Sequence, residues 1–333
     1  MKIFITGIAG FLGSNLANYY IEKGHEVWGN DNLKGGYIDN VNVKANFFKR
    51  DCDDIDFLNR VFKNIDVVVH CAALAHEGLS VFSPSLICKN IIGASVSVFS
   101  AAINQKVKRI VNCSSMARYG NIDRPYLETS TPKPVDPYGI AKLAAEKILI
   151  NLCDTHNTEY NIAIPHNIVG SGQVYNDPFR NVASIMINRI LLGKRPIIYG
   201  DGNQTRCFSD VRDCIYCLDR MITDPSIKSE TINIGPDEEN ITINQLFEII
   251  SNKLGFNEKP IYFPDRPQEV KHSSCSADKS RKLLNYKTKY NVKESIDNMI
   301  SYIKKRGARE FQYNLDLEII NKNTPQTWSS KII

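Results

Sequence analysis

The chain has 333 residues, of which 43% are hydrophobic and 23% charged, the composition of an ordinary globular protein. Its 41 basic and 36 acidic residues give a net charge of +5, too small to indicate a nucleic-acid partner but compatible with an anionic small molecule. No apolar run approaches the roughly 18 residues of a membrane span, and the first residues lack a secretory signal, so we expect no membrane association and a cytoplasmic protein.

Up to Pro165, short apolar runs alternate with longer amphipathic stretches, a pattern typical of βαβ units in a parallel sheet. The pattern predicts an α/β fold with a doubly wound parallel sheet (a Rossmann domain) over residues 1–165. The expected strands are Lys2–Thr6, Val27–Asn30, Asn46–Lys49, Asp66–Cys71, Arg109–Cys113 and Tyr160–Pro165. The expected helices are Gly10–Lys23, Ile55–Lys63, Phe82–Gln105 and Tyr138–His156.

Beyond Pro165 the strict alternation ends, and the sequence predicts a smaller C-terminal α/β cap over residues 166–310, interleaved with the first domain. Its expected helices are Asn181–Leu192, Val211–Met221, Ile243–Leu254 and Lys293–Lys304, and its expected strands are Thr231–Ile234 and Pro260–Phe263. From Phe311 the chain is polar with scattered apolar residues, so we expect residues 311–333 to form a mobile or loosely docked tail.

Nine cysteines are scattered through strands and helices, which predicts reduced thiols rather than a disulfide framework. Cys214 and Cys217 form a C-x-x-C pair, but no second pair at zinc-binding spacing follows. On the expected helix these two side chains merely share a face. We therefore expect a structural role for them and no metal site.

A glycine-rich turn, Gly7-x-x-Gly10-x-x-Gly13, lies between the first expected strand and helix. Glycines there let backbone N–H groups approach a pyrophosphate at the helix N-terminus, although such turns also begin many βαβ units without that function. Asp31 ends the second strand, where a carboxylate can bind both ribose hydroxyls and repel a 2′-phosphate. This favours NAD over NADP, although the positive charge of Lys34 nearby would weaken the repulsion of a 2′-phosphate. The alternative is that Asp31 is an ordinary solvated turn residue.

Tyr138 and Lys142 are four residues apart on an expected helix and so share one face, where the ammonium would favour the ionised phenol. Ser115 follows the strand before that helix. Hydride can leave an alcohol carbon only as the hydroxyl proton departs, so a base and an oxygen-orienting donor must converge. Separately, the three residues have ordinary structural explanations: a core aromatic, a solvated charge and a strand-end cap.

Together these motifs resemble the extended short-chain dehydrogenase/reductase family, in particular its NAD-dependent nucleotide-sugar epimerases and dehydratases. The resemblance covers about residues 1–305. The matching motifs, in chain order, are Gly7-x-x-Gly10-x-x-Gly13, Asp31, His70-Cys71-Ala72-Ala73, Asn90, Ser114-Ser115, Tyr119-Gly120, Pro137-Tyr138-Gly139-x-x-Lys142 and Tyr199-Gly200-Asp201-Gly202-x-x-Thr205-Arg206.

The resemblance implies that Tyr138 is the catalytic base, that Lys142 binds nicotinamide ribose and lowers the tyrosine pKa, and that Ser115 binds the same sugar hydroxyl. It also implies an NAD site. The expected NAD-binding residues are Gly7, Gly10, Phe11, Leu12, Gly13, Asp31, Asn32, Asp51, Cys52, Ala72, Ala73, Asn90, Tyr138 and Lys142.

The two positions after Ser115 discriminate within the family. Its dehydratases carry Asp-Glu there, whereas this chain has Met116 and Ala117, neither of which can transfer a proton. The substitution disfavours 4,6-dehydration and favours an epimerase. Arg118 stands where relatives usually carry a small apolar residue; it could reach a substrate phosphate or carboxylate, or lie on the surface.

The resemblance extends to a nucleotide-sugar site. Asn167 and Met116 are expected at the sugar diphosphate and sugar, Arg206 and Arg266 at the diphosphate, and Glu269 at the nucleoside ribose. Arginine suits a diphosphate because its fork of donors meets two phosphate oxygens, although either arginine could form a surface ion pair instead. A small residue, Ser273 or Cys275, is expected beside the sugar C2 substituent, leaving space for an N-acetyl group.

The sequence thus predicts an NAD-dependent 4-epimerase of a UDP-hexose, with UDP-GlcNAc/UDP-GalNAc or UDP-Glc/UDP-Gal as candidate pairs. The alternatives are a nucleotide-sugar oxidoreductase or dehydratase, a UDP-glucuronate 4-epimerase, and a catalytically silent nucleotide-binding scaffold. The family also implies a homodimer that pairs helices Phe82–Gln105 and Tyr138–His156 from each subunit.

Overall fold

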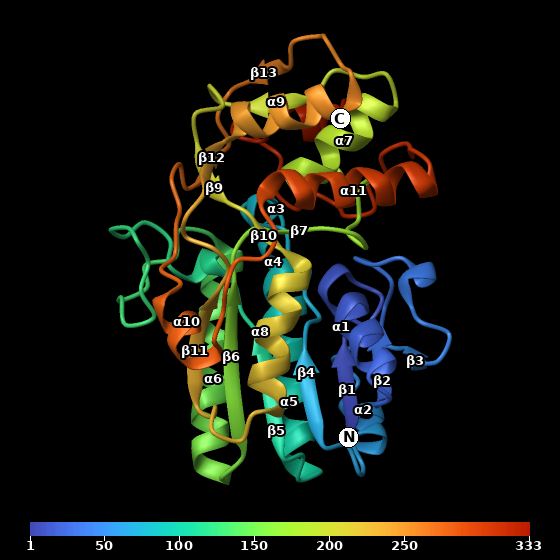
Figure 1. Cartoon of the computed structure of the whole chain (residues 1–333), viewed down its shortest axis with the longest axis vertical. Helices are drawn as coiled ribbons and strands as arrows, with labels where there is room; N and C mark the ends of the chain where they lie inside the picture. Colours follow the sequence, from blue (N-terminus) through green and yellow to red (C-terminus); the bar gives the residue numbers. More distant parts are fainter.

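The computed structural model describes residues 1–333 and confirms the predicted doubly wound fold. Seven strands, all parallel, form the main sheet in the order β11-β6-β5-β4-β1-β2-β3 (Figure 1). They are β1 (Lys2–Thr6), β2 (Glu26–Asp31), β3 (Asn46–Lys49), β4 (Val67–His70), β5 (Arg109–Cys113), β6 (Glu159–Pro165) and β11 (Glu230–Ile234).

Helices cover both faces of this sheet, which explains why a central strand such as β4 is buried along its whole length rather than at alternate residues. Along β1, Ile3 and Ile5 belong to one buried apolar cluster and Phe4 to another. The helices of this half are α1 (Phe11–Glu22), α2 (Ile55–Val61), α3 (Glu77–Ser80), α4 (Pro84–Cys88), α5 (Ala94–Asn104), α6 (Pro137–His156), α8 (Val211–Thr223) and α10 (Asp278–Leu284), with the short turns η1 (Ile38–Asn40), η2 (Lys89–Gly93) and η3 (Met116–Arg118).

A smaller α/β cap lies over one end of the sheet and has its own buried cluster, with Met186, Leu246 and Met299 among its members (Figure 1). Its helices are α7 (Val182–Leu191), α9 (Ile243–Leu254), α11 (Val292–Arg306) and α12 (Gln326–Ser329). Its strands form three two-stranded pairs: β7 (Ile168–Val169) with β10 (Ser209–Asp210), β9 (Thr205–Cys207) with β12 (Asn240–Thr242), and β8 (Ile197–Tyr199) with β13 (Ile261–Phe263).

Two elements that the sequence analysis assigned to the cap lie instead against the main sheet. Strand β11 pairs with β6 at the sheet edge, and α8 packs with α1 beneath the sheet. The apolar residues of β11 are fully enclosed there, as Ile232 shows at 0% exposure. The chain therefore crosses between the two halves repeatedly.

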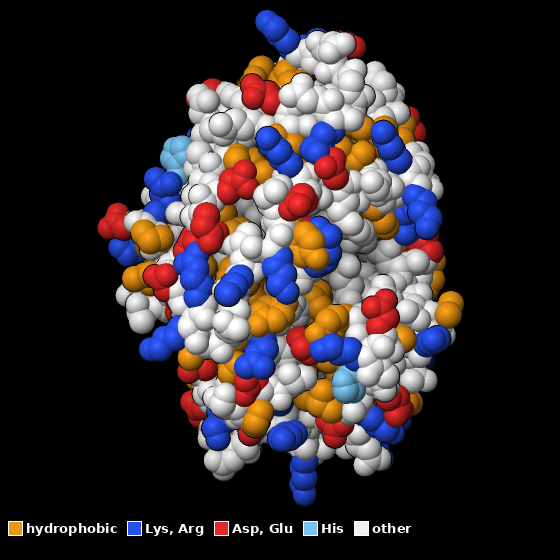
Figure 2. All heavy atoms as spheres, in the orientation of Figure 1, with side chains coloured by type: hydrophobic (Ala, Val, Ile, Leu, Met, Phe, Trp, Pro, Cys, Tyr) orange, Lys and Arg blue, Asp and Glu red, His pale blue; other side chains and the backbone are white.

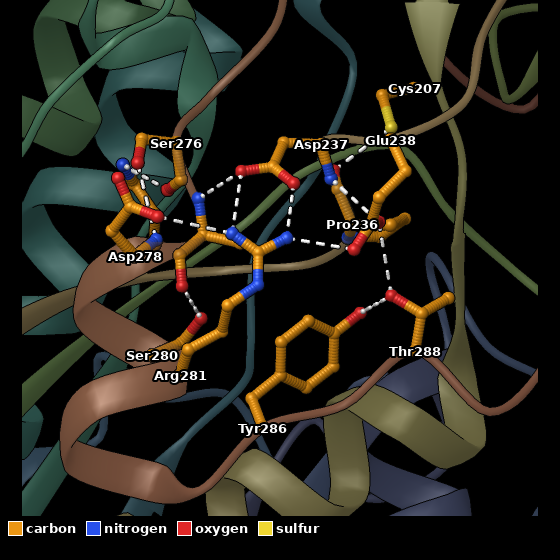
Figure 3. A network of polar contacts seen from close by, with 12 residues as sticks. Cys207, Pro236, Asp237, Glu238, Ser276, Asp278, Ser280, Arg281, Tyr286 and Thr288 are labelled. Carbon is orange, nitrogen blue, oxygen red and sulfur yellow. Dashed lines mark hydrogen bonds and ion pairs between the residues drawn. The ribbon is translucent and has the colours of Figure 1, made fainter.

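A polar network fixes one of these crossings (Figure 3). Arg281 of α10 forms ion pairs with Asp237 and Glu238, in the loop after β11. In the same loop, the Pro236 carbonyl accepts a hydrogen bond from the Cys207 thiol of β9, at 2.9 Å. The network thereby joins a helix of the main sheet to a strand of the cap.

The expected single helix Phe82–Gln105 is divided in the structure into α4, the π-helical turn η2 and α5. The helical stretch Pro84–Asn104 has a mean hydropathy of 1.7 and enough length for a membrane span, which corrects our statement that no run approaches that length. Its inner residues, Val98 and Phe99 among them, are buried in the core. The helical stretch thus packs one side into the core, and 44% of the window is buried.

Charges of both signs are mixed on one face of the molecule, and the thiols are unpaired. Basic and acidic side chains are interspersed over the face seen in Figure 2, without a large area of one sign. All nine cysteines are free, and Cys71 and Cys113 approach each other to 3.6 Å between sulfur atoms. Cys214 and Cys217 are buried in the core between α8 and the sheet.

Candidate active site

One cavity of about 430 Å³ lies where the carboxyl ends of the sheet strands face the cap. This is the edge at which open α/β sheets bind their ligands. Apart from the alternatives Ser273 and Cys275, every predicted site residue lines it except two. Those lining it are Gly7, Gly10, Phe11, Leu12, Asp31, Asn32, Asp51, Cys52, Ala72, Ala73, Asn90, Ser115, Tyr138, Lys142, Asn167, Arg206, Arg266 and Glu269.

The glycine turn is shaped by two close backbone approaches. Gly7 has φ +71°, and a Cβ there would lie 2.8 Å from the Ala72 Cα. A Cβ at Gly13, the first of the two exceptions, would lie 2.2 Å from the Gly7 carbonyl oxygen. Gly13 therefore allows the Gly7 carbonyl to pack closely against α1, on the side of the turn that faces away from the cavity. Gly10 provides no side-chain cap for α1, which leaves the first N–H groups of that helix for a ligand phosphate.

At the adenosine end of the cavity, Asp31 is held by its backbone neighbours. Its carboxylate accepts hydrogen bonds from the N–H groups of Ala9 (3.0 Å) and Leu33 (2.7 Å). Burial raises its pKa, while these hydrogen bonds lower it. Asn32 donates to Asp51 at 2.9 Å. Since a carboxylate has about four acceptor positions, Asp31 retains capacity for ribose hydroxyls.

The three expected catalytic residues converge from two elements. Tyr138 and Lys142 lie one turn apart on α6, whose N-terminus is capped by the Asp136 carboxylate accepting from the Gly139 N–H at 2.9 Å. Ser115 precedes η3, at the end of β5. The Lys142 ammonium lies 5.9 Å from the Tyr138 ring centre and donates to the Cys113 carbonyl at 2.9 Å.

The pKa of the Tyr138 phenol differs in direction from the sequence expectation. Burial raises it, and the Ser115 hydroxyl opposes this by hydrogen bonding. Burial also lowers the pKa of Lys142. The lysine alone thus does not make the tyrosine a base. A bound oxidised nicotinamide, which is cationic, would supply the missing positive charge.

Arg118 neither reaches the cavity nor lies on the surface, contrary to both sequence alternatives. It is buried and forms an ion pair with Glu146 of α6, with 2.9 Å between Nε and Oε2. The other Glu146 oxygen accepts a hydrogen bond from the Ser114 hydroxyl. Arg118, which departs from the family pattern, therefore connects η3 to α6 inside the protein.

Two arginines and one glutamate form a compact cluster on the cap side. Arg266 pairs with Glu269 at 3.1 Å, and Arg206 with the same carboxylate at 3.5 Å. Burial opposes ionisation of Glu269, but the Arg266 guanidinium holds its pKa below the usual value. Two cations share one anion, so the cluster keeps a net positive charge toward the cavity. Asn167, nearby, donates to the Cys207 carbonyl at 3.1 Å.

A small side cavity of about 30 Å³ adjoins the main one. Met116, the second residue outside the main cavity, lines it together with Ser273, and Asn167 and Arg206 line both cavities. Cys275, the other candidate for this place, is fully buried in the core. Of the two candidates, Ser273 therefore lines a cavity and Cys275 does not.

Several further cavity residues were not assigned to the site by the sequence analysis, Glu77, Arg180 and Tyr199 among them. Glu77 is the first residue of α3 and lines both cavities, where its side chain keeps access to solvent. The protein groups packed around it, Asp136 among them, raise its pKa. Arg180 lines the main cavity, where it donates to the Gly35 carbonyl at 2.9 Å and lowers the pKa of Asp31. Tyr199 of β8 lies beneath the Arg266 guanidinium, 4.8 Å from its ring centre.

The fold, the glycine cradle and the convergent serine, tyrosine and lysine define a nucleotide-cofactor enzyme of the dehydrogenase/reductase class. The sequence profile of the NAD dependent epimerase/dehydratase family matches residues 3–235. This chain belongs to that family, whose cofactor is NAD.

Individual relatives agree over nearly the whole chain. A Methanocaldococcus jannaschii protein described as a UDP-glucose 4-epimerase is 33% identical, over 91% of this chain and 98% of its own. The structure of the Thermotoga maritima UDP-glucose 4-epimerase with UDP-glucose is 30% identical (TM-score 0.86), covering 92% of this chain and 99% of its own. A Methanobrevibacter ruminantium UDP-N-acetylglucosamine 4-epimerase with UDP-N-acetylmuramic acid is 30% identical (TM-score 0.85), with the same coverage.

Proposed function

We propose that this protein is an NAD-dependent 4-epimerase of a UDP-hexose. The carrying observation is one cavity in which Ser115, Tyr138 and Lys142 converge and Arg206 and Arg266 form a cationic cluster. Met116 and Ala117, next to the serine, cannot transfer the protons that an elimination requires. The cavity is thus equipped for oxidation and reduction of a nucleotide-sugar carbon and lacks that acid–base pair.

The glycine turn fits NAD, because a Cβ at Gly7 or Gly13 would clash with backbone atoms and distort the turn that approaches the pyrophosphate. When bound, NAD supplies a reversible acceptor for the hydride of the sugar C4. Tyr138 takes the proton of the C4 hydroxyl as that hydride leaves and returns it when the opposite face of the ketone is reduced. Ser115 orients the oxygen, and Lys142 holds the nicotinamide ribose.

The nucleotide is held by the arginine cluster, with Glu269 at its ribose and Asn167 beside the diphosphate. Arg180 is placed to meet the pyrophosphate of NAD. The side cavity touches Arg206, on the diphosphate side, and Met116, on the Ser115 side. It therefore lies along the sugar between C1 and C4, where the small Ser273 leaves space for a C2 substituent. This favours the UDP-GlcNAc/UDP-GalNAc pair.

Incubation of the purified enzyme with UDP-GlcNAc, UDP-Glc and UDP-GlcA, followed by chromatography, tests the proposal. We expect a C4 epimer of UDP-GlcNAc or UDP-Glc, without net change in absorbance near 340 nm. Stoichiometric absorbance change would identify an oxidoreductase instead. Absence of any C4 epimer from all three would refute the proposal.

Glu77 makes nucleotide-sugar affinity depend on pH. The surrounding protein, Asp136 and Glu269 oppose its ionisation while Arg206 and Arg266 favour it, and together they raise its pKa to about 7, although the side chain itself is exposed to the solvent of the cavity. A bound diphosphate adds negative charge nearby, so binding favours protonated Glu77. We expect the Kd of UDP-glucose to rise with pH above about 7, by up to about tenfold per pH unit, as linkage to one proton allows.

Calorimetric titration of UDP-glucose between pH 6 and pH 8.5 measures this dependence. Glu77→Gln should remove it, whereas Glu22→Gln, which changes an exposed carboxylate on α1, should retain it. An unchanged pH profile in the Glu77 variant would contradict the assignment.

We also propose a cytoplasmic homodimer that pairs α5 and α6 of each subunit. Ile140 of α6 is 53% exposed, and Leu143 and Val96 remain partly exposed on the same two helices. Sedimentation should give twice the 37.6 kDa chain mass. Ile140→Arg should shift the protein toward the monomer, since a charge replaces apolar contact area; a monomeric wild-type chain would exclude the dimer.

A further inference from the structure

The segment Phe311–Ile333, here called the C-terminal strap, is packed onto the molecule rather than loosely docked. Trp328 is 2% exposed and Ile333 is 8% exposed. Figure 1 shows the C-terminus within the cap, beside α7. The expectation of a mobile tail failed because a few apolar residues, widely spaced among polar ones, carry the burial.

One end of the strap is tied to the Rossmann half. The Glu318 carboxylate accepts hydrogen bonds from the N–H groups of Ser85 (2.9 Å) and Leu86 (2.7 Å), at the start of α4. The Ser83 hydroxyl donates to the Asp316 carbonyl at 2.6 Å. An anionic side chain is favoured at a helix N-terminus, so the charge of Glu318 stabilises its contact with α4.

The Trp328 ring does not line the main cavity itself but packs against three residues that do. A Cβ at Gly78 would lie 3.3 Å from this ring. The Phe179 ring centre lies 5.2 Å from that of Trp328, edge to face, and the Tyr199 ring centre 6.5 Å away. Gly78, Phe179 and Tyr199 line the cavity from three separate parts of the chain. One side chain of the strap therefore joins the two halves around the site.

Tyr199 connects the strap to the cluster formed by Arg206, Arg266 and Glu269. Its hydroxyl is hydrogen-bonded to the Thr327 hydroxyl, and its ring lies under the Arg266 guanidinium. Arg266 is in turn paired with Glu269. A guanidinium over an aromatic face is held by cation–π attraction, so displacing the ring would displace the arginine.

Ile333 reaches the cavity directly. It lines the same cavity as Tyr199 and belongs to one apolar cluster with Ile197 of β8. Its N–H donates to the Tyr313 hydroxyl at 3.0 Å, and Arg189 donates to the Ile332 carbonyl at 3.4 Å. The neighbouring Ile332 side chain is 46% exposed instead.

We propose that the C-terminal strap is part of the nucleotide-sugar site and closes its cap side over the nucleoside diphosphate. Ile333 provides apolar contact, and Trp328 is a positioning residue that acts on Arg266 through Tyr199. This inference rests on the proposed function for the identity of the ligand. It assigns substrate affinity, and not NAD binding, to the strap.

The test compares Ile333→Ala, Thr327→Val and Trp328→Ala with the matched control Ile332→Ala. We expect the Kd for UDP, measured by calorimetry, and the KM for the UDP-hexose to rise about tenfold or more in the first three variants. The control should match the wild type. Bound NAD should be unchanged throughout, and kcat should change less than KM. If Trp328→Ala does not fold, the two smaller truncations decide, with thermal unfolding as the check.

The outcomes separate the two proposals. Wild-type UDP affinity in Ile333→Ala and Thr327→Val would overturn the role of the strap and leave the proposed function intact. Equal weakening in Ile332→Ala would also overturn it, because that side chain points outward. If the wild-type enzyme bound no UDP at all, the proposed function would fail, and the role of the strap would fail with it.

Discussion

Tyr138→Phe is expected to reduce turnover by about 10³-fold, in the range typical for loss of a general acid–base group. The phenylalanine keeps the buried ring, which is 6% exposed, and removes only the hydroxyl that gives and takes the proton. Steady-state turnover of the accepted UDP-hexose measures the loss. NAD should remain bound in amounts equal to the wild type, since Lys142 and the glycine turn are unchanged.

Tyr119→Phe is the matched control. This tyrosine is also buried, but its hydroxyl donates to the Asn233 side chain at 2.8 Å, outside both cavities. Removing it should lower stability by about 1 kcal/mol, the usual net value of a hydrogen bond, and leave turnover near the wild type. Full activity in Tyr138→Phe, or equal losses in both variants, would refute the base assignment.

Local signals explain why much of the site could be predicted from the sequence. The glycine turn, Asp31 at a strand end and the Tyr138/Lys142 spacing each depend on residues a few positions apart in one βαβ unit. Their placement at the carboxyl edge of the sheet then follows from the fold itself. The same logic gave β1 through β6 and the helix α6.

Long-range packing explains what the sequence did not reveal. His76, next to Glu77, contacts Asp177 at 2.8 Å although 101 positions separate them. Arg180 belongs to the same loop as Asp177. No periodic pattern marks such a pair. Glu77 lies seven residues beyond β4, at the first position of α3, so its place in the chain gave no signal either. The strap carried none, because Trp328 and the pair Ile332-Ile333 are widely spaced apolar residues in a mostly polar segment.

Arg118 shows how a departure from a family pattern can be structural rather than functional. Only the folded chain reveals that Glu146, a helix residue with no distinguishing context, lies beside it. Burial raises the pKa of Glu146, which reflects the cost of placing a charge there. The ion pair offsets that cost, so each partner requires the other.

Glu146→Leu should therefore destabilise the protein by about 3–5 kcal/mol, because it leaves the Arg118 guanidinium buried without a counter-ion. Arg118→Met combined with Glu146→Leu should recover most of this loss, since replacing a whole buried pair by apolar residues is often neutral. Free energies of unfolding from denaturant titration measure both. Lys147→Leu, one position along α6 and exposed, should change stability by less than about 0.5 kcal/mol.

Comparison of the single and double variants decides whether the pair acts as a brace. If the double variant were as unstable as Glu146→Leu, the loss would come from the helix or from the freed Ser114 hydroxyl, and not from an unpaired Arg118. Recovery of stability should also restore turnover, because η3 carries no proton-transfer group and needs only to hold Ser115 against Tyr138. Stability regained without turnover would instead place Arg118 in the catalytic reaction, which its 2.9 Å contact with Glu146 argues against.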